Sequence, residues 1–110
     1  MKQYVIDELR PEDHKALKKY LDQEFGQAAM DEIYWIPVDS NLLTRIQLQH
    51  EDCRPHYLAL ALEPGRLACE LLVRTNNRLR CDCIQYATEL QRNWLIELID
   101  TIFDRLGIAS

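Results

Sequence analysis

Residues 55–84 read PHYLALALEPGRLACELLVRTNNRLRCDCI, and this stretch decides the fold. It contains three short apolar runs, at 56–63, 67–74 and 78–84, which are separated by turn sequences. In the first turn Pro64 fixes a negative φ and Gly65 supplies the positive φ that a type II turn needs. Apolar runs of this length joined by turns predict a three-stranded antiparallel meander.

The two-residue loop Pro64-Gly65 sets the register of the first hairpin. One face carries the large apolar side chains, and its predicted pairs are Leu62 with Leu67, Leu60 with Cys69, and Leu58 with Leu71. The opposite face is mixed and poorer in bulk, and its predicted pairs are Ala61 with Ala68, Ala59 with Glu70, and Tyr57 with Leu72. The leucine face is therefore expected to meet the helices.

The second hairpin has two alternatives. A two-residue turn at Asn76-Asn77 would bring Arg80 and Asp82 into the core, whereas a three-residue loop at 76–78 turns these charges outward. We expect the longer loop, which places Cys81 and Cys83 on the leucine face as small buried side chains. With the shorter loop both cysteines would face outward.

Two amphipathic helices flank the meander. Pro11 and the acids that follow it favour a helix start, and Gly26 favours its end. Thr88 and Gln91 have the spacing of a capping box, which predicts a second helix over about 89–106. Both segments carry apolar residues at helical spacing.

The remaining segments are short. Residues 4–9 and 33–38 read as strands, and Pro37 places the second at a sheet edge or exit. Thr44 and Gln47 again have capping-box spacing, which favours a short helix near 44–50 over a strand. The predicted order is β-α-β-β-β-β-α. We expect one α+β domain spanning residues 1–110, with a mostly antiparallel five-stranded sheet and the two amphipathic helices on one of its faces.

Composition limits the function. The net charge of −5 disfavours nucleic acid as a partner. The chain shows no long apolar run and no basic leader, so no membrane association is expected and a cytoplasmic location is predicted. The four cysteines are then expected to be reduced thiols.

The sharpest candidate for chemistry is a metal site. His50 and Cys53 form one closely spaced pair, and Cys81 and Cys83 form another about thirty residues later. Zinc prefers four nitrogen or sulfur ligands in two such pairs. Cys-x-Cys on a strand, however, is not a usual spacing for zinc ligands. Cys53 also has a histidine three residues away on each side, His50 and His56. Buried thiols and surface histidines are therefore the preferred interpretation, and zinc is the alternative.

Other chemistry has weaker support in the sequence. Cys53 between His50 and His56 could form a nucleophile with a base, although closeness in sequence is not catalytic geometry. Cys81-x-Cys83 lacks the C-x-x-C spacing of dithiol catalysts. An anion site at Arg74, Arg78 and Arg80 has no motif behind it. We therefore predict no catalytic residues and no bound cofactor.

The mixed sheet face is the candidate interface. It combines small side chains with an aromatic one, as association surfaces do, and its residues are Tyr57, Ala59, Ala61, Ala68 and Leu72. A homodimer is the preferred explanation of this face, and a covering loop of the same chain is the other. The preferred function is thus a non-enzymatic module that binds a protein or peptide and forms a homodimer. A zinc-binding protein using His50, Cys53, Cys81 and Cys83 is the alternative.

Overall fold

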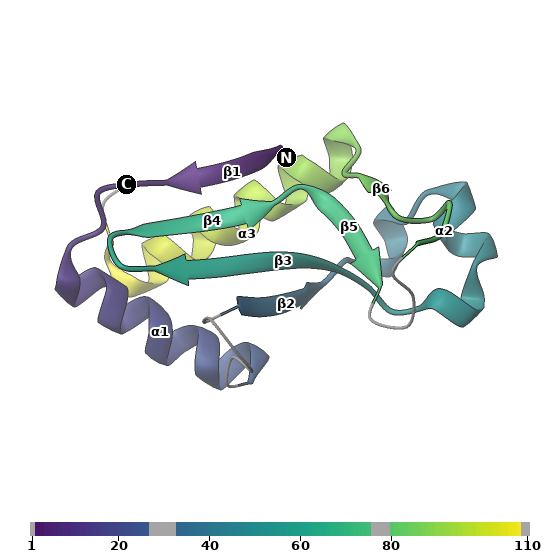
Figure 1. The fold of residues 1–110 in the computed structure, drawn as a ribbon. Coiled ribbons are helices and arrows are strands. Elements are labelled where there is room, and N and C mark those ends of the chain that lie inside the picture. Colours follow the sequence, from purple (N-terminus) through teal and green to yellow (C-terminus); the bar gives the residue numbers. More distant parts are fainter. Residues whose placement is uncertain (1, 27–32, 76–79, 109–110) are drawn as a thin grey trace.

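The computed structural model describes residues 2–26, 33–75 and 80–108, and these residues form an α+β fold (Figure 1). The fold class and the antiparallel sheet are as predicted. The helices are α1 (Pro11–Phe25), α2 (Arg45–Gln49) and α3 (Glu89–Leu106), with two 3₁₀ turns, η1 (Ser40–Leu42) and η2 (Glu51–Cys53). The strands are β1 (Gln3–Ile6), β2 (Ile33–Pro37), β3 (His56–Glu63), β4 (Arg66–Glu70), β5 (Leu72–Thr75) and β6 (Gln85–Tyr86).

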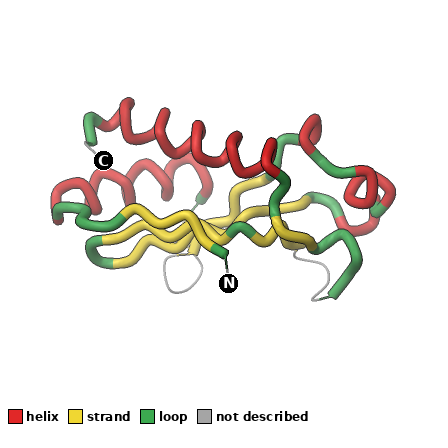
Figure 2. Tube along the Cα trace, turned by 90° about the horizontal axis from the view of Figure 1, so that it is seen from above, coloured by secondary structure: helices red, strands yellow, loops and turns green. Residues whose placement is uncertain are grey.

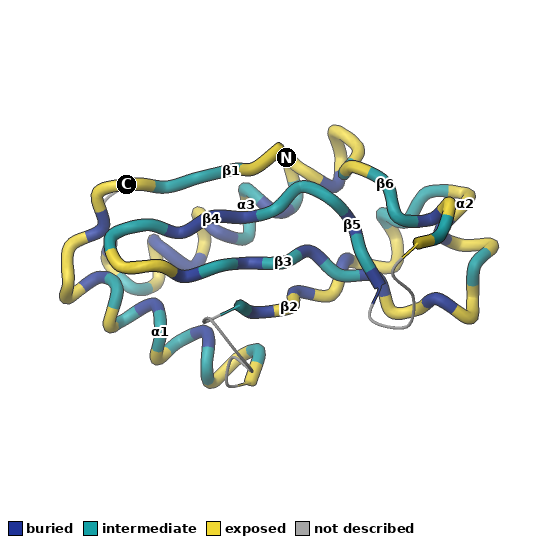
Figure 3. The backbone as a smooth tube through the Cα atoms, viewed as in Figure 1, coloured by how far each residue is buried: buried dark blue, intermediate teal, exposed yellow. Residues whose placement is uncertain are grey.

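The β3–β4 hairpin is the centre of the sheet. Gly65 has a φ of 80°, the left-handed conformation that a turn after Pro64 requires. The predicted pairs Leu62–Leu67, Leu60–Cys69 and Ala61–Ala68 are all present. Residues alternate between buried and half-buried along β3 as far as the exposed Glu63 (Figure 3), which matches the alternation of leucine and alanine in the sequence.

The second strand of the meander is divided at Leu71, so the sheet has six strands rather than five. The Leu71 amide donates to Lys2 O at 3.1 Å, and its carbonyl accepts from the Ala87 amide at 2.7 Å. Beyond this break the register moves by two residues, and Tyr57 pairs with Arg74. The predicted pairs Tyr57–Leu72 and Leu58–Leu71 are therefore wrong. Because the shift is two residues, each side chain keeps its predicted face.

The predicted third strand is mostly a turn. The Ile84 amide donates to Cys81 O at 3.0 Å, and only Gln85–Tyr86 pair with β5. Cys81 and Cys83 thus leave the leucine face, and of the three cysteines expected there only Cys69 belongs to the core. The predicted loop at 76–78 lies outside the described residues.

Helices α1 and α3 cover one face of the sheet, as predicted (Figure 2). Their buried side chains join the β3 leucines in a single core; they are Leu17 and Leu21 of α1, and Leu95, Ile99, Ile102 and Phe103 of α3. Gly26 and Gly107 end the two helices with positive φ. In the described ranges, no helix combines the length and apolar character needed to cross a bilayer.

The flanking segments follow their local signals closely. Thr44 and Gln47 form a complete capping box on α2, which confirms the short helix near 44–50. Strand β1 ends at Ile6 rather than Leu9, because Glu8 adopts a φ of 61° and turns the chain toward α1.

Candidate metal centre

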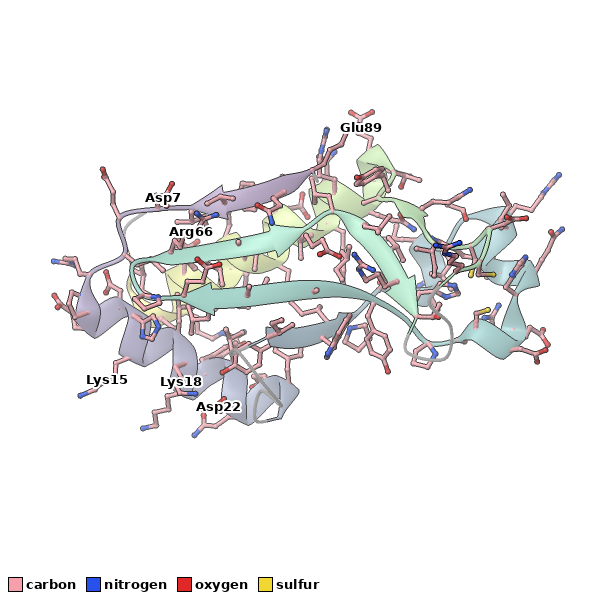
Figure 4. All side chains as sticks on the ribbon, in the orientation of Figure 1. Asp7, Lys15, Lys18, Asp22, Arg66 and Glu89 are labelled. Carbon is pink, nitrogen blue, oxygen red and sulfur yellow. The ribbon has the colours of Figure 1, made fainter. Side chains whose placement is uncertain are left out.

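His50, Cys53, Cys81 and Cys83 converge at the end of the sheet beside α2. Their ligand atoms all lie within 4.8 Å of one another, and the sulfur atoms gather beside α2 in Figure 4. Cys53 and Cys83 are buried, whereas Cys81 is partly exposed. We call the region formed by residues 44–54 and 80–86 the α2 end.

The His50–Cys53 pair is set by the 3₁₀ turn that follows α2. The Cys53 amide donates to His50 O at 3.0 Å, and the Arg54 amide donates to Glu51 O at 3.2 Å. In such a turn the side chains of residues i and i+3 point the same way. His50 and Cys53 therefore offer their ligand atoms on one side.

The Cys81–Cys83 pair lies on the turn that replaces the predicted third strand. The carbonyl of Cys81 closes this turn, and the backbone amide of Cys83 donates to Cys81 Sγ. Cys81 and Cys83 therefore lie on a turn rather than on a strand, so the sequence argument against zinc from Cys-x-Cys on a strand does not apply.

The distances between the ligand atoms can be compared with those of a tetrahedral zinc site. Two sulfurs each ~2.3 Å from a zinc ion lie about 3.8 Å apart at tetrahedral angles, and Cys53 Sγ lies 3.7 Å from Cys81 Sγ. His50 Nδ1 lies 2.9 Å from Cys81 Sγ, closer than the roughly 3.6 Å expected around zinc. The ligand atoms are spread over as much as 4.8 Å, so binding would require the imidazole to move away from Cys81 and the more distant ligands to move inward.

The thiols differ strongly in acidity. Hydrogen bonds from the backbone and side chain of Cys83 lower the pKa of Cys81 to about 7. Burial and the adjacent thiols raise the pKa of Cys83 to about 12. Cys81 therefore loses its proton more readily than Cys83, and a bound dication would favour the thiolate form of its ligands, since thiols are deprotonated when they coordinate a metal.

Two buried glutamines connect the cluster to α3. Gln47 Nε2 donates to Cys83 O at 3.3 Å, and Gln91 Nε2 donates to Gln47 Oε1 at 3.0 Å and to Leu42 O at 2.9 Å. Both side chains are completely buried, and both also accept a capping bond, from the Thr44 and Thr88 amides. Sequence reasoning assigned them to caps and missed this bridge. The sequence did contain a signal for this bridge, because both capping boxes have glutamine rather than glutamate. Only the glutamine amide can accept the capping bond and still donate another hydrogen bond.

An open cavity of about 460 Å³ gives solvent access to the cluster; its lining residues are Gln49, His50, Glu51, Asp52, Cys53 and Cys81. A metal ion can therefore reach the ligands without unfolding of the sheet. Cys83 does not line this cavity and closes the site from the protein side.

All four predicted metal ligands are thus brought together. His56 lies apart from them at the start of β3, where its ring is buried, so Cys53 is not placed between two histidines. The imidazole contact of His50 is with Cys81, a pairing that could also activate a thiol nucleophile. Two further thiols at the same point favour a metal site over that alternative.

The other predicted residues lie elsewhere. Tyr57, Ala59, Ala61 and Leu72 are half-buried and Ala68 is buried at 4% exposure. By the register of the strands, all five lie on the sheet face opposite the buried β3 leucines. Of the arginines proposed for an anion, Arg74 contacts Glu70, Arg80 is exposed and Arg78 lies outside the described residues. They do not form a common site.

Comparison with profiles of known protein families, with curated proteins and with solved structures gives no match.

Proposed function

We propose that this chain is a zinc-binding protein that holds one ion with His50, Cys53, Cys81 and Cys83. One observation carries the proposal: four ligand atoms from two segments about thirty residues apart in sequence lie within 4.8 Å of one another. This reverses the preference from the sequence, where the zinc site was the alternative.

The donor set favours zinc and a structural role. Three thiolates and one imidazole suit a soft or borderline ion, whereas calcium and magnesium prefer oxygen ligands. Four protein ligands complete a tetrahedron and leave no position for a substrate. The proposed ion therefore stabilises the fold, in keeping with a protein that is not an enzyme.

The α2 end has the weak apolar packing that a structural ion would compensate. The two aliphatic side chains of α2 point outward, with Ile46 exposed to 36% and Leu48 to 44%. A five-residue helix is unstable in isolation. Joining His50 and Cys53 to the turn at Cys81 through one ion would hold both segments in place.

The binding of a protein or peptide remains a prediction for the sheet face opposite the helices. A cytoplasmic location also remains a proposal. The four cysteines are free thiols, and a zinc site of this kind needs a compartment that keeps them reduced.

Metal content after purification under reducing conditions tests the proposal. Elemental analysis and native mass spectrometry should find one zinc ion per chain. Cys83→Ser should weaken zinc binding by at least about a hundredfold, more than the loss of an outer hydrogen bond to a ligand. Cys69→Ala is the matched control, because Cys69 is a buried free thiol outside the cluster and its loss should leave the zinc content unchanged. A wild-type protein without stoichiometric metal, or equal zinc loss in both variants, would overturn the proposal.

A further inference from the structure

Two of the proposed zinc ligands lie close enough to react with each other. Cys53 Sγ lies 3.7 Å from Cys81 Sγ, whereas two bonded sulfurs are about 2.0 Å apart. Cys53 belongs to η2 and Cys81 to the turn before β6, so a bond between them needs these segments to approach by roughly 2 Å. A small movement within the α2 end is therefore enough to join them in a disulfide.

The same two thiols are reached from solvent through one cavity. Cys53 and Cys81 line the open cavity of about 460 Å³ at the α2 end. Within the pair Cys81 is the more exposed, because it is partly exposed and Cys53 is only 2% exposed. An accessible cysteine beside a second cysteine that can resolve its oxidised form is a common arrangement in redox-sensitive proteins.

Cys83 is the less favourable partner for Cys81, although it belongs to the same cluster. Its side chain is fully buried at 0% exposure, on the protein side of the ligands. Its carbonyl accepts a hydrogen bond from Gln47 Nε2 at 3.3 Å, which ties this residue to α2 from within. An oxidant in the cavity therefore meets Cys81 with Cys53 beside it, and Cys83 stays behind them.

We propose that a hydroperoxide entering this cavity converts Cys53 and Cys81 to a disulfide and thereby releases the zinc ion. The inference rests on the proposed zinc site. Two ligands, His50 and Cys83, remain after the oxidation, and they are too few to complete the tetrahedron in which proteins hold structural zinc. The α2 end is then a modification site at which peroxide is read out as loss of the ion.

The reaction consumes one peroxide for each disulfide. Cys81 Sγ attacks one peroxide oxygen, the O–O bond breaks and hydroxide leaves, which gives a sulfenic acid on Cys81. Cys53 Sγ then attacks Cys81 Sγ, the S–S bond forms, the S–O bond breaks and a second hydroxide leaves. The two sulfurs lose two electrons to the peroxide, and the two hydroxides take two protons from solvent to become water. Zinc leaves as the dication without a change of charge, and a thiol reductant that cleaves the disulfide restores both ligands.

Peroxide treatment of the zinc-loaded protein, freed of reductant, tests this inference. One equivalent of hydrogen peroxide per chain should release the zinc, which a chromogenic chelator detects against an untreated sample. Thiols that can be alkylated after denaturation should fall from the four of the sequence to two, Cys69 and Cys83. Peptide mass mapping should find Cys53 linked to Cys81, and a thiol reductant with added zinc should restore the loaded protein.

Cys69→Ala is the matched control, because Cys69 is a fully buried free thiol outside the cluster. This variant should release zinc as the wild type does and form the same disulfide. The zinc-free, reduced wild type should form it as well, because the placement of the two sulfurs belongs to the chain.

The outcomes separate the two proposals. Absence of zinc before the treatment would refute the metal proposal, and the zinc-free sample would still show whether Cys53 and Cys81 pair. A loaded protein that keeps its ion after the peroxide is consumed, a disulfide to Cys83 in place of Cys53, or oxygen added to Cys81 without a disulfide would each overturn the present inference and leave the metal proposal intact.

Discussion

The body of the sheet and the α2 end are stabilised by different kinds of contact. In the body, the β3 leucines and the buried faces of α1 and α3 form one apolar core. At the α2 end the arrangement is reversed, because Ile46 and Leu48 are exposed while Gln47 is completely buried. Burial of apolar side chains holds the first region together, whereas buried hydrogen bonds join the second to α3, and there we propose that an ion adds to them.

Zinc removal should give the largest difference between the two regions. A strong chelator should abolish the hydrogen-exchange protection of residues 45–53 and 80–86 while β3 and α3 retain theirs, since local units open independently. The apparent stabilisation lost is about 4 kcal/mol when free zinc exceeds the dissociation constant a thousandfold. Restoring zinc should restore protection, and simultaneous loss of protection in β3 would contradict the separation of the two regions.

A substitution that creates a cavity in the core of the sheet should destabilise the body and leave the proposed zinc site intact. Leu60 is 1% exposed in the core, so Leu60→Ala should lower the free energy of unfolding by about 3 kcal/mol, as measured by urea denaturation. The folded variant should still bind one zinc ion. Loss of zinc at concentrations of denaturant where the variant is folded would show that the two regions are coupled.

The hydrogen bonds of Gln47 and Gln91 join the two regions, so a substitution there tests how strongly the α2 end depends on α3. Gln91→Glu keeps the acceptor for the α3 cap but loses the donor to Leu42 O and Gln47 Oε1. The expected cost is more than the roughly 2 kcal/mol of a buried polar group left without its partner, because a carboxylate at this position is also buried against two acceptor oxygens.

Hydrogen exchange shows in which residues Gln91→Glu lowers the stability. Gln91→Glu should reduce protection in α2, and Thr88→Ala serves as the control because it removes the α3 cap without touching the bridge. Thr88→Ala should cost about 1 kcal/mol at the start of α3 only. Equal changes in α2 for the two variants would contradict the role assigned to the amide.

The smallest effect is expected at the edge of the body. Tyr34 Oη donates to Asp22 Oδ1 at 2.6 Å, and this bond, with help from Lys18, lowers the pKa of Asp22 below its ordinary 3.8. A carboxyl with a lowered pKa adds stability that is present above its unfolded pKa and is lost as the pH falls through its folded value.

Tyr34→Phe should therefore be slightly less stable than the wild type near neutral pH. The difference should shrink below about pH 4, where the carboxyl becomes protonated. Thermal unfolding of both proteins across this range measures it, and a constant difference at all pH values would exclude the hydrogen bond to Asp22 as its source.

Sequence reasoning succeeded where the structural signal is local. The Pro64-Gly65 turn, the two capping boxes and the helix end at Gly26 each depend on residues within a few positions of one another. The alternation of leucine and alanine in β3 likewise indicates which residues of the strand are buried. These features predicted the hairpin, the helices and the face that they cover.

It failed where distant residues determine the backbone. Residues 80–84 alternate like a strand, but Cys81 and Cys83 meet His50 and Cys53, which no local pattern reveals. Because Cys81 and Cys83 were expected on a strand, zinc binding was predicted only as the alternative function. The division of the meander at Leu71 has a similar cause, because its hydrogen bonds go to Lys2 and Ala87 rather than to β3.

Cobalt substitution tests the central claim most directly. The zinc-free, reduced protein titrated with Co²⁺ should bind one ion per chain and develop the intense visible absorption of tetrahedral cobalt together with a thiolate-to-cobalt charge-transfer band, because three sulfurs and one nitrogen surround the ion. Zinc should displace the cobalt and abolish both features, and Cys83→Ser should weaken the charge-transfer band. The weak absorption of octahedral cobalt, or full wild-type bands in Cys83→Ser, would contradict a site built from His50, Cys53, Cys81 and Cys83.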